Sequence, residues 1–207
     1  MNFPKYAAVA LCLATFAASA EGLYVVGEVT RSSDSLSRDH FDQSLTSAGA
    51  TGLSSSAREG SNQWRLQGGY RFGENWAVEA GYIDLGKAKY SAAYSGGTAS
   101  GSLEAAGFDA AGLYLLPLAS GITVFGKAGV MLAKVKSNLA GVPGAGAGSV
   151  NASSNSVKPL LGLGLTYALT EHIDLRSEFD HVGHIGSANR TGTMNASMFS
   201  VGVVYRF

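Results

Sequence analysis

Cysteine is almost absent from this chain, since Cys12 is the single cysteine among 207 residues. One cysteine cannot form a disulfide within the chain, and cysteine-rich metal sites are excluded. Excess charge of either sign is also missing, because 15 lysines and arginines balance 15 acidic residues. Nothing therefore suggests broad electrostatic attraction to nucleic acid. Beyond the first twenty residues, no apolar run approaches the roughly 18 residues of a membrane-spanning helix, which excludes helical spans there.

The first twenty residues have the parts of a secretory signal peptide. Lys5 precedes a short apolar run, and the small residues 18–20 fit a cleavage site just before Glu21. The run is too short to span a bilayer. We therefore predict a signal peptide over 1–20 and a single exported domain, free of cysteine, over 21–207.

Hydrophobicity in the exported part alternates with a period of two. Trp64 and Leu66, for example, share one parity while Arg65 and Gln67 share the other. Successive strand side chains face opposite sides, so the pattern predicts about eight strands of about 10 residues, enough to cross a bilayer at a tilt of about 45°. The segments are about residues 23–31, 64–72, 76–82, 104–116, 122–132, 158–167, 173–180 and 199–207.

The segment 104–116 is rich in alanine and glycine, which weakens its parity. We expect Phe108, Tyr114 and Leu116 to face outward and Asp109 to face inward.

The connections between these segments alternate strictly between short and long. Tight turns are predicted at 73–75, 117–120 and 170–172, and long polar or glycine-rich loops at 32–62, 86–102, 137–156 and 183–195. Outer-membrane barrels have short periplasmic turns and longer external loops. The predicted fold is all-β, an eight-stranded antiparallel up-and-down transmembrane β-barrel.

A soluble β-sandwich or lipocalin-like barrel would show the same alternation, with the apolar parity in a core. The aromatic residues favour the membrane barrel because they gather towards the two ends of the strands, as girdles at the two membrane surfaces do. The expected periplasmic girdle is Phe72, Trp76, Tyr167, Tyr205 and Phe207, and the outer girdle is Trp64, Tyr82, Phe179 and Phe199.

Charged residues of the inward parity fall at similar heights along the strands. An eight-stranded barrel is only just wide enough for its own side chains, so we expect these residues to pair in a polar network. The alternative is a narrow or gated ion path. The residues are Glu28, Arg65, Arg71, Glu79, Lys127, Arg176 and Glu178.

Three stretches resemble the transmembrane domain of the OmpA-like outer-membrane proteins, in the porin-like superfamily. They are GYRFGENWAVEAGY at 69–82, PLLGLGLTYALT at 159–170 and VVYRF at 203–207, and the resemblance spans nearly the whole exported part. It implies the outer membrane of a Gram-negative cell envelope and delivery to the barrel assembly machinery through Phe207. It also implies a monomer, without cofactor, whose external loops serve membrane integrity or adhesion.

Two features depart from that family. The chain stops at Phe207, so the family's periplasmic peptidoglycan-binding domain is not expected here. The family also tends to hold a lysine on its fourth strand within a salt-bridge gate, where Ala111 and Leu113 stand in this chain.

Some eight-stranded outer-membrane barrels are lipid A deacylases or acyltransferases, and a deacylase needs a serine activated by a base. His184 and Ser187, with Glu178 or Asp180, are the nearest candidates, but their spacing does not match the His-x-Ser-Asn arrangement of that deacylase family. We therefore expect no enzyme activity. His181 and His184 are three residues apart on a strand and would face opposite sides, so no metal site is expected either.

Lys134 and Lys136 share the outward parity at the outer end of their strand. The phosphates of lipopolysaccharide lie at that level of an outer membrane, so contact with them is a hypothesis, with solvated rim lysines as the alternative.

Overall fold

The computed structural model describes residues 22–32, 38–58, 63–141, 149–187 and 192–207. Side chains are described throughout these ranges except at 32, 38–40, 149–150, 184–187 and 192–196. The predicted signal peptide, 1–20, lies outside the described residues. In the described ranges, no helix is both long and apolar enough to cross a membrane.

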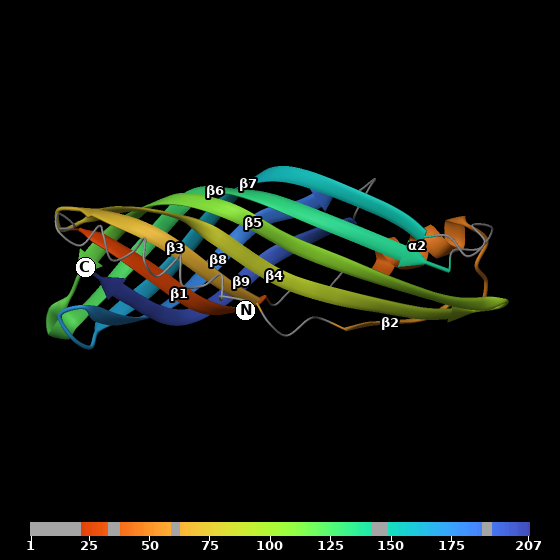
Figure 1. Ribbon diagram of the computed structural model, residues 1–207, viewed down its shortest axis with the longest axis horizontal. Coiled ribbons are helices and arrows are strands. Elements are labelled where there is room, and N and C mark those ends of the chain that lie inside the picture. The colour runs from red at the N-terminus through yellow and green to blue at the C-terminus, as the bar shows by residue number, and fades with distance from the viewer. Residues whose placement is uncertain (1–21, 33–37, 59–62, 142–148, 188–191) are drawn as a thin grey trace, which may run out of the picture.

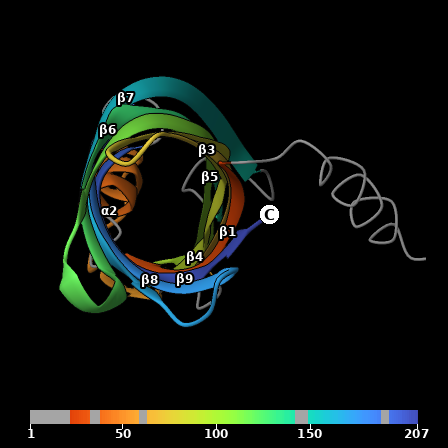
Figure 2. The ribbon, with the colours of Figure 1, turned by 90° about the vertical axis from the view of Figure 1, so that its left-hand side faces the viewer.

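Eight antiparallel strands close into a barrel, which confirms the predicted fold. Each strand pairs with the next along the chain, and β9 pairs back to β1. The ring is visible end-on in Figure 2. The strands are β1 (Leu23–Ser32), β3 (Gln63–Phe72), β4 (Trp76–Tyr94), β5 (Gly97–Pro117), β6 (Ile122–Ala140), β7 (Ser149–Ala168), β8 (Ile173–Ser187) and β9 (Gly192–Arg206).

The predicted tight turns join β3 to β4, β5 to β6 and β7 to β8, so all three lie at one end of the barrel. Gly73 has a φ of 63° in the first turn, a left-handed conformation that glycine adopts readily. The second turn holds a short 3₁₀ helix, Ala119–Gly121.

The two faces of the sheet differ in chemistry as the alternation predicts. Leu163 on the outer face is 68 % exposed, whereas Glu178 on the inner face is 1 % exposed. In β5 the expected facing is confirmed, since Phe108 is 61 % exposed and Asp109 only 4 %. The barrel therefore has an apolar outside and a polar inside.

The predicted long loops 86–102 and 137–156 are corrected by the structure, because they are mostly strand. β4 and β5, of 19 and 21 residues, run to a two-residue turn between Tyr94 and Gly97, and β6 and β7 have similar lengths of 19 and 20 residues. Figure 1 shows these four strands extending beyond β8 and β9. Loop 183–195 is shortened in the same way by β8 and β9. In these extensions small residues stand on both faces, so hydrophobicity does not alternate clearly and the sequence predicts loops.

The first long loop, 32–62, is also corrected, because it contains α2 (Arg38–Ser47) and β2 (Ser54–Arg58). β2 pairs antiparallel with the outer part of β4. Phe41 and Leu45, four residues apart on one face of α2, are both buried. The helix therefore packs against the inner face of the extended hairpins.

Candidate functional site

A cluster of charged side chains fills the middle of the barrel. Arg176 of β8 holds Glu79 of β4 through two contacts, Nη1 to Oε1 at 2.5 Å and Nη2 to Oε2 at 3.0 Å. Glu178 accepts from Arg65 Nη1 at 2.5 Å and from Lys127 Nζ at 3.0 Å. Arg176 also pairs with Glu178 on its own strand. All five side chains are at most 3 % exposed. Ion pairs therefore link strands on opposite sides of the lumen.

Several members of this cluster were missing from the predicted network. Asp180 lies 2.6 Å from Arg65 Nη1, and Asp109 accepts a hydrogen bond from Gln67 at 2.7 Å. The hydroxyl of Tyr24 donates to Glu79 Oε1 at 2.9 Å. Asp180, Asp109 and Tyr24 all stand on the inward parity of their strands, which is the sequence signal that identifies them.

The predicted members Glu28 and Arg71 have different positions. Glu28 Oε2 is 3.5 Å from Arg65 Nη1, within the cluster. Arg71 lines an interior cavity on the turn side of the cluster, together with Glu79 and Arg176, and among the described residues it forms no ion pair. Its guanidinium donates to the carbonyl oxygens of Gly73 at 3.1 Å and Glu74 at 2.7 Å. Its position, one residue from the end of β3, places it at the turn end of the lumen, where it is half-buried.

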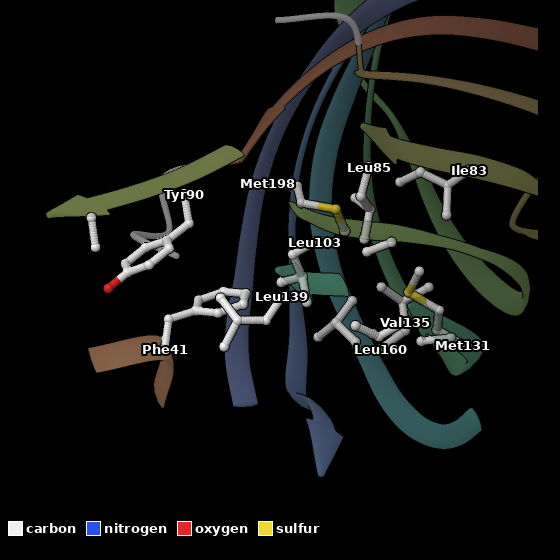
Figure 3. Close-up of a cluster of buried hydrophobic side chains, with 14 of the residues drawn as sticks. Phe41, Ile83, Leu85, Tyr90, Leu103, Met131, Val135, Leu139, Leu160 and Met198 are labelled. Carbon is white, nitrogen blue, oxygen red and sulfur yellow. The ribbon is translucent and has the colours of Figure 1, made fainter. Parts of the chain in front are cut away.

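An apolar layer lies beyond the charges, on the side of the long hairpins. Five side chains from five strands form it, each at most 1 % exposed. Figure 3 shows four of them, with Leu85 and Leu103 nearby. The five are Ile83, Met131, Leu160, Val182 and Met198.

The outer end of this apolar layer continues into the packing of α2. The rings of Phe41 and Tyr90 stack with centroids 4.8 Å apart, and both contact the same core as Leu139 (Figure 3). The Tyr90 hydroxyl donates to Asp42, which also accepts from Ser55 Oγ at 2.9 Å. These contacts hold α2 against the extended hairpins.

A cavity of about 80 Å³ lies on the other side of the charges, towards the tight turns. Glu79 and Arg176 form part of its wall, together with Phe125, whose ring lies 4.4 Å from the Arg176 guanidinium carbon. Arg206 and Gly121, near the turns, line its opposite end. This cavity can hold a few water molecules and ends at the ion pairs.

The predicted aromatic girdle residues lie on the outside of the barrel. Trp76, Phe72, Tyr167 and Tyr205 are exposed near the tight turns, and Trp64, Phe179 and Phe199 are exposed farther along the strands. Tyr82 and Phe207 are half-buried. Tyr82 contacts the rings of both Trp64 and Phe108, with centroids 5.5 Å and 5.3 Å apart.

The remaining candidates lie apart from the interior. Lys134 and Lys136 are exposed on the outer face of β6. His181 Nδ1 lies 3.1 Å from Ser197 Oγ, and among the described residues no carboxylate contacts this histidine. The side chains of His184 and Ser187 lie outside the described part of the chain. The described residues contain no group of three metal-ligating side chains.

Comparison with known proteins places these features in a family. The family model described as "OmpA-like transmembrane domain" matches residues 35–207. Outer membrane protein A of Salmonella typhi is 33 % identical over 143 residues, which cover 68 % of this chain and 38 % of that protein. Outer membrane protein A of Klebsiella pneumoniae is 31 % identical over 145 residues, 68 % of this chain and 39 % of that protein. The chain thus matches about two fifths of the length of these curated relatives.

Solved structures share the fold. Neisserial surface protein A superposes with a TM-score of 0.55 at 18 % identity, over 91 % of this chain and 99 % of that one. The outer membrane protein OprG of Pseudomonas aeruginosa gives a TM-score of 0.51 at 16 % identity, over 90 % of this chain and 96 % of that one. At this level of identity the likeness concerns the fold alone.

Proposed function

This chain belongs to the family of OmpA-like transmembrane domains and lies in the outer membrane, and from that premise we propose that it is a closed, non-enzymatic structural barrel with a folded external surface. Its barrel contributes to membrane integrity, and its long hairpins present a surface to partners outside the cell. Assembly as a monomer through the terminal Phe207 is part of the same proposal.

One observation carries the structural part of this proposal, the filling of the lumen at successive levels. The ion pairs around Arg176 are followed by the apolar layer around Met131 and then by α2 with Phe41. Water and ions pass an apolar constriction at a high free-energy cost, because their polar groups find no partners there. A lumen filled in this way favours a scaffold over a channel.

The surface role is supported by the regular, hydrogen-bonded structure of the long hairpins. β4 to β7 continue as hydrogen-bonded hairpins well beyond the charged cluster, and α2 and β2 pack on them. A folded surface offers partners a preorganised shape, which reduces the entropy lost on binding. Adhesion through this part is therefore the surface-interaction role that we propose.

A cell-based experiment separates the two parts of the proposal. A strain lacking the protein should become more sensitive to detergent and lose surface attachment, and the wild-type gene should restore both. A variant with hairpin substitutions Ser91→Asp and Ser100→Lys, which face each other as opposite charges, should restore detergent resistance but not attachment. Full resistance in the strain without the protein would contradict the structural role.

The narrow pore is the alternative, since the cavity near the tight turns reaches the ion pairs from one side. Purified wild-type protein and Glu178→Ala are to be compared in planar bilayers. The closed barrel predicts no steady conductance for either, together with lower thermal stability for the variant. Discrete channel openings whose size changes in Glu178→Ala would establish the pore instead.

Absence of enzyme activity is tested on the substrate of the related barrel enzymes. Mass spectrometry of lipid A from cells with and without the protein should give the same acylation pattern. A change in acyl-chain number that depends on Ser197 or Ser187 would refute the non-enzymatic proposal.

A further inference from the structure

The outer face of β4, β5 and β6 changes chemistry abruptly just beyond an aromatic row. Tyr82, Phe108 and Leu132 are direct cross-strand neighbours, and this row is apolar and outward-facing. Aromatic and aliphatic rows of this kind mark the interface between hydrocarbon and headgroups. The next outward positions on the same strands therefore lie at headgroup level.

The first row beyond the aromatic row holds Asp84, Ala106 and Lys134, and the second holds Lys87, Glu104 and Lys136, so cations outnumber acids by three to two. Lys134 follows Leu132 on β6 by one outward step and Lys136 by two, and both are exposed. Lys87 of β4 stands on the same ladder row as Lys136, with Glu104 of β5 between them. Farther out, Arg58 of β2 lies directly opposite Lys89 of β4. Like charges directly opposite each other destabilise a sheet, unless an anion lies between or over them.

A groove runs over this part of the surface. It has a volume of about 490 Å³ and is lined by the apolar row at one end and by the lysines at the other. Its floor has few side-chain atoms, because it includes the small residues Gly86, Ala106 and Gly107. A register shift between Asp84 and Lys87 interrupts the pairing of β4 with β5 at the same place. The groove therefore has an apolar end, where an acyl chain of a lipid would lie, and a cationic end, where its phosphate would lie.

The acids near the groove neutralise only part of its charge. Glu104 is paired with Lys87 at 2.7 Å, and the Asp84 carboxylate accepts from the Gly86 amide at 2.8 Å. Within the described residues, neither Lys134 nor Lys136 has an ion-pair partner. Both ammonium groups above the aromatic row therefore lack a direct ion pair in the described part of the chain, although Lys136 lies opposite Glu104 on the neighbouring strand.

We propose that this groove binds the phosphorylated headgroup of an outer-leaflet glycolipid of the lipid A type. Lys134 and Lys136 contact the phosphate, and the acyl chains lie along Phe108 and Leu132. The inference rests on the proposed outer-membrane scaffold, and it names the lipid that the scaffold holds. Surface lysines and phosphates form charge-assisted hydrogen bonds, which neutral headgroups cannot replace.

The test measures lipid binding by the purified full-length mature chain in detergent, by native mass spectrometry. The probes are bisphosphorylated lipid A and a phosphate-free analogue with the same acyl chains. The double variant Lys134→Ala, Lys136→Ala should bind bisphosphorylated lipid A about 30-fold more weakly, since each lysine near an anionic surface contributes about a fivefold gain. Its affinity for the phosphate-free analogue should not change.

Two matched variants control for charge and for folding. Arg31→Ala with Arg58→Ala removes the same charge from two exposed positions that do not line the groove, and it should leave lipid A binding unchanged. Glu104→Gln removes the competing carboxylate and should tighten binding. Equal loss of affinity in both double variants, or equal affinity for the two lipids, would overturn the proposal. Failure of the wild-type chain to fractionate with the outer membrane would instead overturn the underlying scaffold.

Discussion

Arg176 illustrates how single residues hold the interior together. Its guanidinium contacts Glu79 and Glu178 at once and lies over the ring of Phe125. An arginine fork matches carboxylate geometry better than a lysine does, which suits a site that must satisfy two acids. The residue therefore acts as a central link between β4 and β8.

Replacing Arg176 with alanine should destabilise the barrel by about 3–5 kcal/mol, because two buried carboxylates each lose one of their cationic partners. The measurement is the urea midpoint of refolded protein in detergent, followed by gel mobility. The double variant Arg176→Met, Glu79→Gln removes both charges and should be more stable than Arg176→Ala. If the two variants were equally unstable, lost packing rather than an unpaired charge would explain the effect.

Glu104 allows a pH prediction outside the membrane. The hydrogen bond from Lys87, together with its positive charge, holds the pKa of Glu104 below its usual range. A lowered folded-state pKa means that the bridge stabilises the fold above the unfolded pKa and that this contribution is lost as pH falls through the folded pKa. Both side chains are about half exposed (49 % and 48 %), so the contribution is well under about 1 kcal/mol.

Lys87→Ala should therefore raise the pKa of Glu104 towards its ordinary value. Carboxyl carbon shifts of Glu104, followed by NMR through a pH titration in detergent, measure this directly. Lys89→Ala serves as the control and should leave the titration of Glu104 unchanged. A titration of Glu104 that is identical with and without Lys87 would contradict the ion pair.

The inward charges could be predicted from sequence because the side-chain period of a strand is fixed. Glu79, Lys127 and Glu178 stand on the parity opposite to large apolar residues, and the structure places them together. Arg71 has the same parity, yet its height at the end of β3 decides its contacts. Parity gives the face of a residue, whereas its partners depend on the stagger between strands.

Where two strands of the barrel approach each other closely, a glycine is needed because a side chain would collide with the neighbouring strand. A Cβ at Gly202 of β9 would lie 2.1 Å from the Gly27 carbonyl oxygen and 2.6 Å from Glu28 Cγ. At Gly68 of β3, by contrast, no atom lies within 4 Å of such a Cβ. Only the first site requires the absence of a side chain.

Gly202→Ala should therefore destabilise the barrel by about 1–3 kcal/mol through overpacking against β1. Gly68→Ala should be neutral within the error of the same urea titration. Equal stability of the two variants would show that the strands can separate without cost at this point.

The packing of α2 gives a second prediction for an element. Phe41→Ala removes a buried ring that stacks on Tyr90, and Phe to Ala changes in cores cost about 3–5 kcal/mol. Because α2 packs on the hairpins, this loss should appear as faster amide exchange in 38–58 while the heat-modifiability midpoint of the barrel stays unchanged. Gln43→Ala, on the exposed face of the helix, is the control. Unchanged exchange in Phe41→Ala would mean that the helix is held by other contacts.

Sequence patterns located the membrane-level part of each strand but missed the external part. Between Ser91 and Ser102 all residues except Tyr94 are small, so hydrophobicity does not alternate, and hydrogen bonding to the neighbouring strands decides the structure. The helix at 38–47 has only Phe41 and Leu45 as apolar anchors, too few to predict a helix without the surface on which it packs.

The closed barrel is the property of the whole molecule that the sequence predicted best. Strict alternation of tight and long connections indicated up-and-down topology, and the pairing of β1 with β9 closes the ring. The layered filling of the lumen could not be predicted in the same way, because it depends on which inward residues from five strands meet at one level. The packing of α2 on the inner face of the hairpins could not be predicted either, because the sequence of this segment predicts a loop.

The central claim is that the apolar outer face touches lipid hydrocarbon, and tryptophan fluorescence tests it most directly. Both tryptophans of the chain, Trp64 and Trp76, are exposed on that face. In bilayers of lipids brominated along their acyl chains, the account predicts strong quenching of the wild-type emission and little quenching by aqueous iodide. A mature chain that stays monomeric in water without detergent, with emission quenched by iodide and not by the brominated lipids, would contradict it.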